Sequence, residues 1–168
     1  IKKFIENRLQ KKLERDQAQL RILSEGDLQS CVYFHLRKFI QCKKFVENWY
    51  LTNKLPMGKQ RKDKSFPDIV IMRLRDEGNV VKPVFLIELK EHSRYVATSV
   101  KSDLEKLAFA YNRWRDVEQT YFILATPDEK NDSKTILEKM KTIRNNALGK
   151  NKRHSTIIPI PVNAIHTI

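Results

Sequence analysis

Acidic and basic side chains occur together inside one apolar segment of this chain. In VFLIELK, residues 84–90, Glu88 and Lys90 lie two positions apart among Val, Phe, Leu and Ile. Asp68 follows Pro67 and precedes a second apolar run, twenty residues before Glu88. Charged groups are costly to bury unless they are paired or bind a cation. Because Mg²⁺ takes carboxylate oxygens together with water and phosphate oxygens, these residues predict a hard-metal site.

Such a site could carry out metal-assisted hydrolysis of a phosphodiester. Two carboxylates hold the metal ion that activates a water, and a nearby ammonium can orient this water and stabilise charge on the phosphate. The triplet of an acidic residue, any residue and Lys is a weak signal alone, since it recurs at 128–130 and 132–134. Only Glu88 lies within an apolar run after a Pro-Asp pair, with a third carboxylate, Glu25, upstream.

The elements that position these residues follow from their periodicity. Side chains alternate along a strand, so Glu88 and Lys90 share one face and their apolar neighbours occupy the other. Residues 66–74 predict a neighbouring strand, and turn residues at 76–79 join the two strands into a hairpin. We therefore expect Asp68 to approach Glu88 across this hairpin, with their carboxylate oxygens within about 5 Å.

The rest of the chain alternates between helical and strand patterns. Apolar residues at every third or fourth position predict helices, and short apolar runs predict strands. Pro83 is expected to precede the strand at 84–90. The predicted helices span 2–23, 24–41, 97–115 and 133–148; further strands are predicted at 45–51, 120–126 and 157–162, and a mobile basic loop at 52–65. The strand at 157–162 should lie at an edge, because its two prolines remove backbone donors.

These elements predict a single α/β domain over residues 1–168 with a mixed central sheet flanked by helices. Its core, residues 24–126, has the order helix, three strands, helix, strand. Residues 1–23 are expected to form an N-terminal helical arm, and residues 127–168 add a helix and the edge strand.

The composition favours a polyanionic partner. The 168 residues are 40% hydrophobic and 32% charged, with a net charge of +13. Basic residues concentrate in 1–23, 37–64 and 130–154, whose net charges are +4, +7 and +6. Basic stretches of this kind are typical of phosphate backbone contacts, although solvated helix faces explain each stretch about as well.

No apolar run reaches the length of a membrane span, so we expect a soluble intracellular protein, cytoplasmic or nuclear. The sequence starts at Ile1 rather than Met, so a recognition domain could precede it or be supplied by a partner. Cys31 and Cys42 lack the spacing of a zinc site and are expected to be reduced, packed thiols.

Three segments together resemble the PD-(D/E)xK nuclease superfamily, which has the restriction-endonuclease-like fold. They are SEGDL at 24–28, FPD at 66–68 and IELK at 87–90. The resemblance covers about residues 24–126, and the predicted order of elements matches the core of that family.

The resemblance implies a role for each matching residue. Asp68 and Glu88 would be the metal ligands, with the Leu89 backbone carbonyl as a further ligand. Lys90 would orient the attacking water. The helix carboxylate of the family falls on Glu25, and its neighbour Asp27 stays an alternative.

The function that follows is a Mg²⁺-dependent DNA endonuclease, with Mn²⁺ as a substitute, that acts on double-stranded or branched DNA and leaves a 5′-phosphate. Lys59, Arg61, Lys62 and Lys64 are the predicted nucleic-acid contacts within the basic loop. The first helix could also mediate a homodimer with two active sites. The alternative is a non-catalytic, basic nucleic-acid-binding or assembly module whose carboxylates are structural.

Other polar residues have simpler interpretations. Asp103 and Lys106 could approach the phosphates, but a solvated helix face is favoured for both. His35 is expected to be packed or on the surface. His92, two residues after Lys90, could contact a phosphate, although little favours this role.

Overall fold

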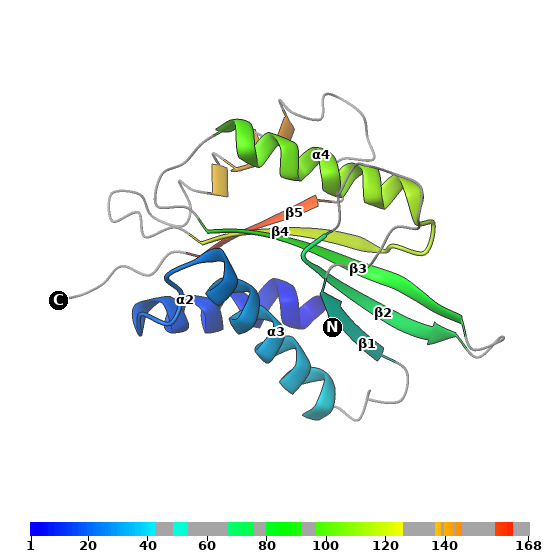
Figure 1. Ribbon diagram of the computed structural model, residues 1–168, viewed down its shortest axis with the longest axis horizontal. Helices are drawn as coiled ribbons and strands as arrows, with labels where there is room; N and C mark the ends of the chain where they lie inside the picture. Colours follow the sequence, from blue (N-terminus) through cyan, green and yellow to red (C-terminus); the bar gives the residue numbers. More distant parts are fainter. Residues whose placement is uncertain are drawn as a thin grey trace.

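A five-stranded sheet forms the centre of the computed structural model, which describes residues 1–42, 49–53, 67–75, 80–91, 97–125, 137–138, 140–142, 144–145 and 157–162 (Figure 1). Its strands, in spatial order, are β1 (Trp49–Asn53), β2 (Ile69–Arg75), β3 (Val80–Glu91), β4 (Gln119–Ala125) and β5 (Ile157–Val162). β1, β2 and β3 pair antiparallel, whereas β4 and β5 continue the sheet in parallel. The predicted α/β class with a mixed sheet is confirmed, and the proline-containing β5 lies at an edge of this sheet, as expected.

Helices cover both faces of the sheet (Figure 1). One face packs against α1 (Lys2–Phe4), the π-helical turn η1 (Ile5–Leu9), α2 (Gln10–Ala18) and α3 (Glu25–Cys42), and the other packs against α4 (Ala97–Arg113). β3 contributes alternate residues to the two cores: Ile87 and Leu89 to the first, Leu86 to the second. The alternation predicted for this strand is therefore confirmed, and it directs Glu88 and Lys90 toward α4.

The β2–β3 hairpin is longer than the sequence pattern suggested. β3 begins at Val80, so Pro83 lies inside the strand and does not precede it. The pairing shifts between Ile71, which faces Phe85, and Met72, which faces Pro83. A proline is tolerated at such an irregularity because regular backbone pairing is already interrupted there.

The N-terminal segment is not an arm, contrary to the prediction. Ile5, Leu9 and Leu13 are completely buried, and the helical segment ends at Ala18 and not near Leu23. A strict spacing of four drifts by about 40° per step on an α-helix, and the wider π-helical turn counteracts this drift. Burying each of these side chains contributes about 2 kcal/mol, which makes the segment part of the core.

A buried carboxylate joins α2 to α3. Asp16 is 6% exposed; its Oδ2 lies 2.6 Å from Nε2 of His35, and its Oδ1 lies 3.3 Å from Nη1 of Arg21. Burial, followed by the charge of Asp16, raises the pKa of the Cys31 thiol to about 11. His35 is thus packed, as predicted, whereas Cys42 is exposed and does not fit the prediction of two packed thiols.

We expect Asp16→Ala to lower the free energy of unfolding by about 3 kcal/mol, because it leaves His35 without its buried partner. Urea denaturation followed by circular dichroism measures this loss. Glu105→Ala is the control, since Glu105 makes an exposed ion pair with Lys101 and should change stability by less than about 0.5 kcal/mol. Equal stability of the two variants would show that the Asp16 cluster is not structural.

Several predicted segments lie partly outside the described residues. β1 contains Thr52 and Asn53, which the sequence pattern assigns to the basic loop, and residues 54–66 and 76–79 are not described. Of the helix predicted at 133–148, the described positions at 137–138, 140–142 and 144–145 are helical, and Met140 is buried. No helix in the described part of the chain is long and apolar enough to cross a membrane.

Candidate active site

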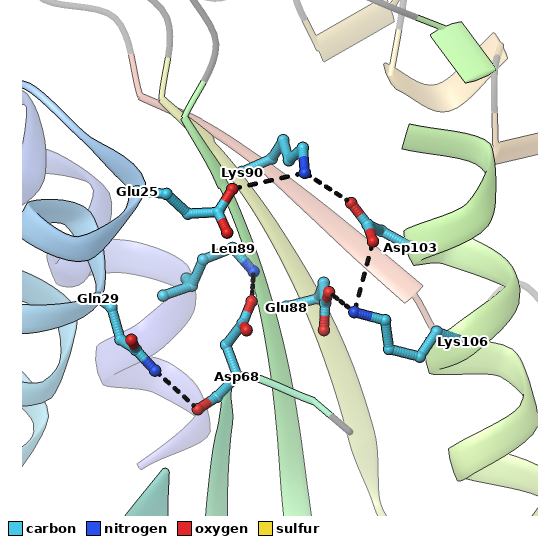
Figure 2. Close-up of polar contacts among 8 residues, drawn as sticks. All are labelled: Glu25, Gln29, Asp68, Glu88, Leu89, Lys90, Asp103 and Lys106. Carbon is cyan, nitrogen blue, oxygen red and sulfur yellow. Dashed lines mark hydrogen bonds and ion pairs between the residues drawn. The ribbon is translucent and has the colours of Figure 1, made fainter. Parts of the chain in front are cut away.

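Asp68 lies at the point where β2 begins beside β3. Ile69 pairs with Ile87, so continuing the antiparallel register by one residue places Asp68 opposite Glu88. Oδ2 of Asp68 accepts a hydrogen bond from the backbone N–H of Leu89 at 2.9 Å (Figure 2). Burial raises the pKa of Asp68 despite this hydrogen bond. The hairpin therefore brings Asp68 to the IELK segment through the Leu89 amide.

Glu88 is the most deeply buried charged side chain of the site, with a side-chain exposure of 2%. Its Oε1 accepts a hydrogen bond from Nζ of Lys106, and its Oε2 has no hydrogen-bond partner among the residues that the structure describes. Burial, reinforced by the nearby charge of Asp68, raises the pKa of Glu88 to about 8. A carboxylate in this position requires a nearby cation to remain ionised.

Lys90 extends from the same face of β3 as Glu88. Its Nζ lies 3.4 Å from Oδ2 of Asp103 and 3.5 Å from Oε2 of Glu25 (Figure 2). Burial lowers the pKa of Lys90, but the charges of Asp103 and Glu25 outweigh it and leave the pKa above its usual value. Lys90 is therefore an ammonium at neutral pH, which donates hydrogen bonds and stabilises negative charge but does not accept a proton.

The two candidate helix carboxylates, Glu25 and Asp27, have different contacts at the start of α3. Oγ of Ser24 accepts the Asp27 backbone N–H at 3.2 Å and donates to Oδ2 of Asp27 at 2.8 Å. Asp27 Oδ2 also accepts the Leu23 backbone N–H at 3.2 Å. Ser24 and Asp27 thus form a capping arrangement at the start of the helix, whereas Glu25 contacts Lys90.

Gln29, one turn after Glu25, belongs to the site although sequence reasoning did not select it. Its Nε2 donates to the backbone carbonyl of Asp68 at 3.1 Å (Figure 2). The spacing of Glu25 and Gln29 could have indicated this role, because residues four positions apart lie on the same face of a helix. Gln29 therefore links α3 to the backbone that carries Asp68.

The prediction that Asp103 and Lys106 lie on a solvated helix face is wrong. Their side chains are 14% and 20% exposed, and Nζ of Lys106 lies 3.4 Å from Oδ1 of Asp103 as well as contacting Glu88. On α4 they flank the apolar stripe that includes Leu104 and Leu107, so they face the sheet and not the solvent. Burial lowers the pKa of Lys106, but the charge of Glu88 outweighs this effect and raises it.

The donor set fits a hard cation that keeps several waters. The described residues contain no group of three or more His, Cys, Asp or Glu side chains arranged to hold a metal ion. Mg²⁺ is commonly bound through only one or two carboxylates, with water and substrate oxygens completing its shell. Asp68 and Glu88 meet this requirement, and Oε2 of Glu88, which lacks a partner among the described residues, is an available ligand. For Leu89 the observed contact is through its amide, and the role of its carbonyl stays a prediction.

The remaining predicted contacts lie outside the described residues. They are the basic-loop residues Lys59, Arg61, Lys62 and Lys64, together with His92.

No protein-family model, curated protein or solved structure matches this chain. The fold and the site together define an α/β protein with an open mixed sheet and a partly buried cluster of carboxylates and lysines between β3, α3 and α4.

We expect the stability of the metal-free protein to depend on pH through Glu88. Folding raises the pKa of Glu88 from 4.5 to about 8. Between pH 4.5 and pH 8, Glu88 is therefore protonated in the folded state and ionised in the unfolded state. The free energy of unfolding therefore falls as the pH rises through this range, by up to about 1.4 kcal/mol per pH unit. Glutamine does not titrate, so the stability of Glu88→Gln relative to wild type should increase from pH 5 to pH 8.

Urea denaturation in EDTA at pH 5, 6.5 and 8 tests this difference. Glu105→Gln, an exposed carboxylate on α4, is the control and should follow wild type at every pH. A constant difference between Glu88→Gln and wild type across the series would contradict the expectation.

Proposed function

We propose that this chain is a divalent-metal-dependent endonuclease that hydrolyses DNA phosphodiesters. The observation that carries the proposal is Glu88, buried on β3 with a carboxylate oxygen that has no partner among the described residues, opposite Asp68 and on the same strand face as Lys90. Surface charge does not account for a carboxylate that is buried to this degree without a full set of partners.

The arrangement of elements supports membership of the PD-(D/E)xK superfamily. The order α3, β1, β2, β3, α4, β4 agrees with the helix, three strands, helix, strand core that the sequence resemblance implied. The antiparallel β1–β3 portion brings Asp68, which immediately precedes β2, next to Glu88 on β3, and β4 runs parallel to β3. The fold assignment to this superfamily is part of the proposal.

In the proposed reaction each residue has a separate task. Asp68 and Glu88 would hold the metal ion, which when bound would lower the pKa of a water and balance charge on the phosphate. Lys90, kept protonated by Glu25 and Asp103, donates a hydrogen bond to the attacking water or to the phosphate. Glu25 and Asp103 position the Lys90 ammonium. In-line attack of the water on phosphorus would break the P–O3′ bond, leaving a 5′-phosphate and a 3′-hydroxyl whose oxygen takes up a proton from solvent.

The net charge of +13 supports a nucleic-acid substrate held by its backbone. If six phosphates are contacted, the logarithm of the DNA association constant should fall with the logarithm of the salt concentration with a slope of about −5. Neutralising Lys59, Arg61, Lys62 and Lys64 together should make this slope measurably shallower.

Fluorescence anisotropy with duplex DNA in Ca²⁺ measures the slope. Lys101, Arg113 and Arg115, from the net-acidic middle of the chain, provide a control triple variant whose slope should stay near that of wild type. A wild-type association constant that does not depend on salt would remove the argument from charge.

The second candidate is a non-catalytic nucleic-acid-binding or assembly module. The contacts of Lys106 with Glu88, and of Lys90 with Asp103 and Glu25, favour it, because they partly balance the charges without a metal ion. Nicking of supercoiled plasmid with Mg²⁺, Mn²⁺ or EDTA distinguishes the two. We expect nicking with either metal and none in EDTA; no cleavage of duplex, single-stranded or branched DNA with either metal would favour the binding module.

A further inference from the structure

Lys106 has an unusual position for a lysine on a surface helix. The long side chains of such residues normally extend their ammonium groups into water. The Lys106 side chain is only 20% exposed and reaches from α4 to the strand, where Nζ contacts Oε1 of Glu88 (Figure 2). Lys101, on the same helix, is 58% exposed and pairs with Glu105. The Lys106 ammonium is therefore partly dehydrated, and its contact with Glu88 compensates for the lost hydration.

The charge of the site explains why an ammonium is held there. Counted as ionised, the carboxylates Glu25, Asp68, Glu88 and Asp103 outnumber the ammonium groups of Lys90 and Lys106 by two. One divalent cation would balance this difference. Within this cluster, Lys106 is the cation that contacts the most buried carboxylate.

The two lysines of this cluster share Asp103 as a partner but differ in the other carboxylate that each contacts. Lys90 contacts Asp103 and Glu25, and neither of these is a proposed metal ligand. Lys106 contacts Glu88, which is a proposed ligand. Lys106 also has a second carboxylate within reach, because Oδ1 of Asp103 lies 3.4 Å from its Nζ. Lys106 can therefore release Glu88 and still remain paired with Asp103.

We propose that Lys106 is a tethered counter-ion that competes with the divalent cation for Glu88. In the metal-free protein the ammonium stabilises the ionised form of Glu88, and cation binding requires displacement of this ammonium toward Asp103. This inference rests on the proposed function only in taking Glu88 as a metal ligand. It assigns Lys106 a role in setting metal affinity, which differs from the role of Lys90 in the reaction.

The competition predicts that removing Lys106 strengthens cation binding. Lys106→Met keeps much of the apolar stem and removes the charge. We expect it to bind Ca²⁺ at least about fivefold more tightly than wild type at pH 8, measured by isothermal titration calorimetry. Lys106→Arg should stay close to wild type because it retains the positive charge. Lys101→Met is the matched control and should also bind Ca²⁺ like wild type.

Thermal unfolding gives a second measurement on the same variants. Lys106→Met should have a lower melting temperature than wild type in EDTA and a larger increase on addition of Ca²⁺, because the cation replaces the missing charge. If Lys106→Met folds and binds Ca²⁺ no more tightly than wild type, the competition is refuted. If the metal-free variant is too unstable to isolate, recovery of a folded protein by refolding in Ca²⁺ supports the proposal, and failure to recover it refutes the proposal.

These measurements do not depend on DNA cleavage. Tighter Ca²⁺ binding by Lys106→Met, together with a wild-type protein that never cuts DNA, would uphold the counter-ion role and reject the nuclease. Cleavage by wild type without any change in Ca²⁺ affinity in the variant would do the reverse.

Discussion

Asp68→Asn and Glu88→Gln should each reduce Mg²⁺-dependent plasmid cleavage by at least about a thousandfold, which corresponds to about 4 kcal/mol in the activation free energy. Both changes preserve the size of the side chain and remove the negative charge that we propose holds the metal ion. Glu88 is the more sensitive position, because its side chain is 2% exposed and bulk water has little access to take its place as a ligand. DNA affinity in Ca²⁺ should change by less than about threefold, since the proposed contacts with DNA phosphates lie largely outside this site.

Initial rates of plasmid nicking and anisotropy with a labelled duplex measure the two effects separately. Glu105→Gln removes an exposed carboxylate from α4 and should leave both unchanged. Retention of full cleavage by either Asp68→Asn or Glu88→Gln would exclude that residue as a metal ligand. Loss of DNA binding together with cleavage would indicate a structural effect and contradict the separation of the two roles.

The sequence was sufficient to predict the central part of the site because strand geometry is regular. Period-two alternation placed Glu88 and Lys90 on one face of β3, and the hairpin placed Asp68 next to β3. Both results require only knowledge that the segments are adjacent antiparallel strands. The capping contacts within residues 24–27 can also be recognised from sequence, because a capping box is formed by residues three positions apart.

The contribution of α4 could not be predicted from such local rules. Whether Asp103 and Lys106 face solvent or the sheet depends on the rotation of the helix about its axis, and residues beside the apolar stripe can do either. Lys106 also has a long, flexible side chain, so its direction is determined by the carboxylate it meets and not by its own position.

The N-terminal helical segment was mispredicted for a related reason. Its apolar residues at 5, 9 and 13 indicated an amphipathic helix, but amphipathicity does not identify the surface that the apolar face covers. The structure places this face in the core, where Tyr121 of β4 also donates a hydrogen bond to Glu6 at 3.3 Å. A pairing across more than one hundred residues of sequence has no local signal.

Replacement of Lys90 provides the sharpest distinction between catalysis and binding. Lys90→Met should lower the cleavage rate by about a hundredfold or more, or roughly 3 kcal/mol, because a charged donor near the developing phosphate charge is lost. Its ammonium contacts Glu25 and Asp103, and neither is a proposed metal ligand. Ca²⁺ affinity should therefore be retained, in contrast to Asp68→Asn and Glu88→Gln, which should weaken it.

Calorimetry with Ca²⁺ and single-turnover cleavage with Mg²⁺ make this comparison, and Lys101→Met is the control for loss of a lysine from the surface. Lys90→Arg should recover part of the rate, since it restores the charge with a different shape. A Lys90→Met protein that binds Ca²⁺ and cleaves at the wild-type rate would reduce Lys90 to a structural partner of Glu25 and Asp103. Loss of cleavage with Ca²⁺ affinity intact would instead require an ammonium that acts on the phosphate or the water, because neither metal binding nor folding would then explain the defect.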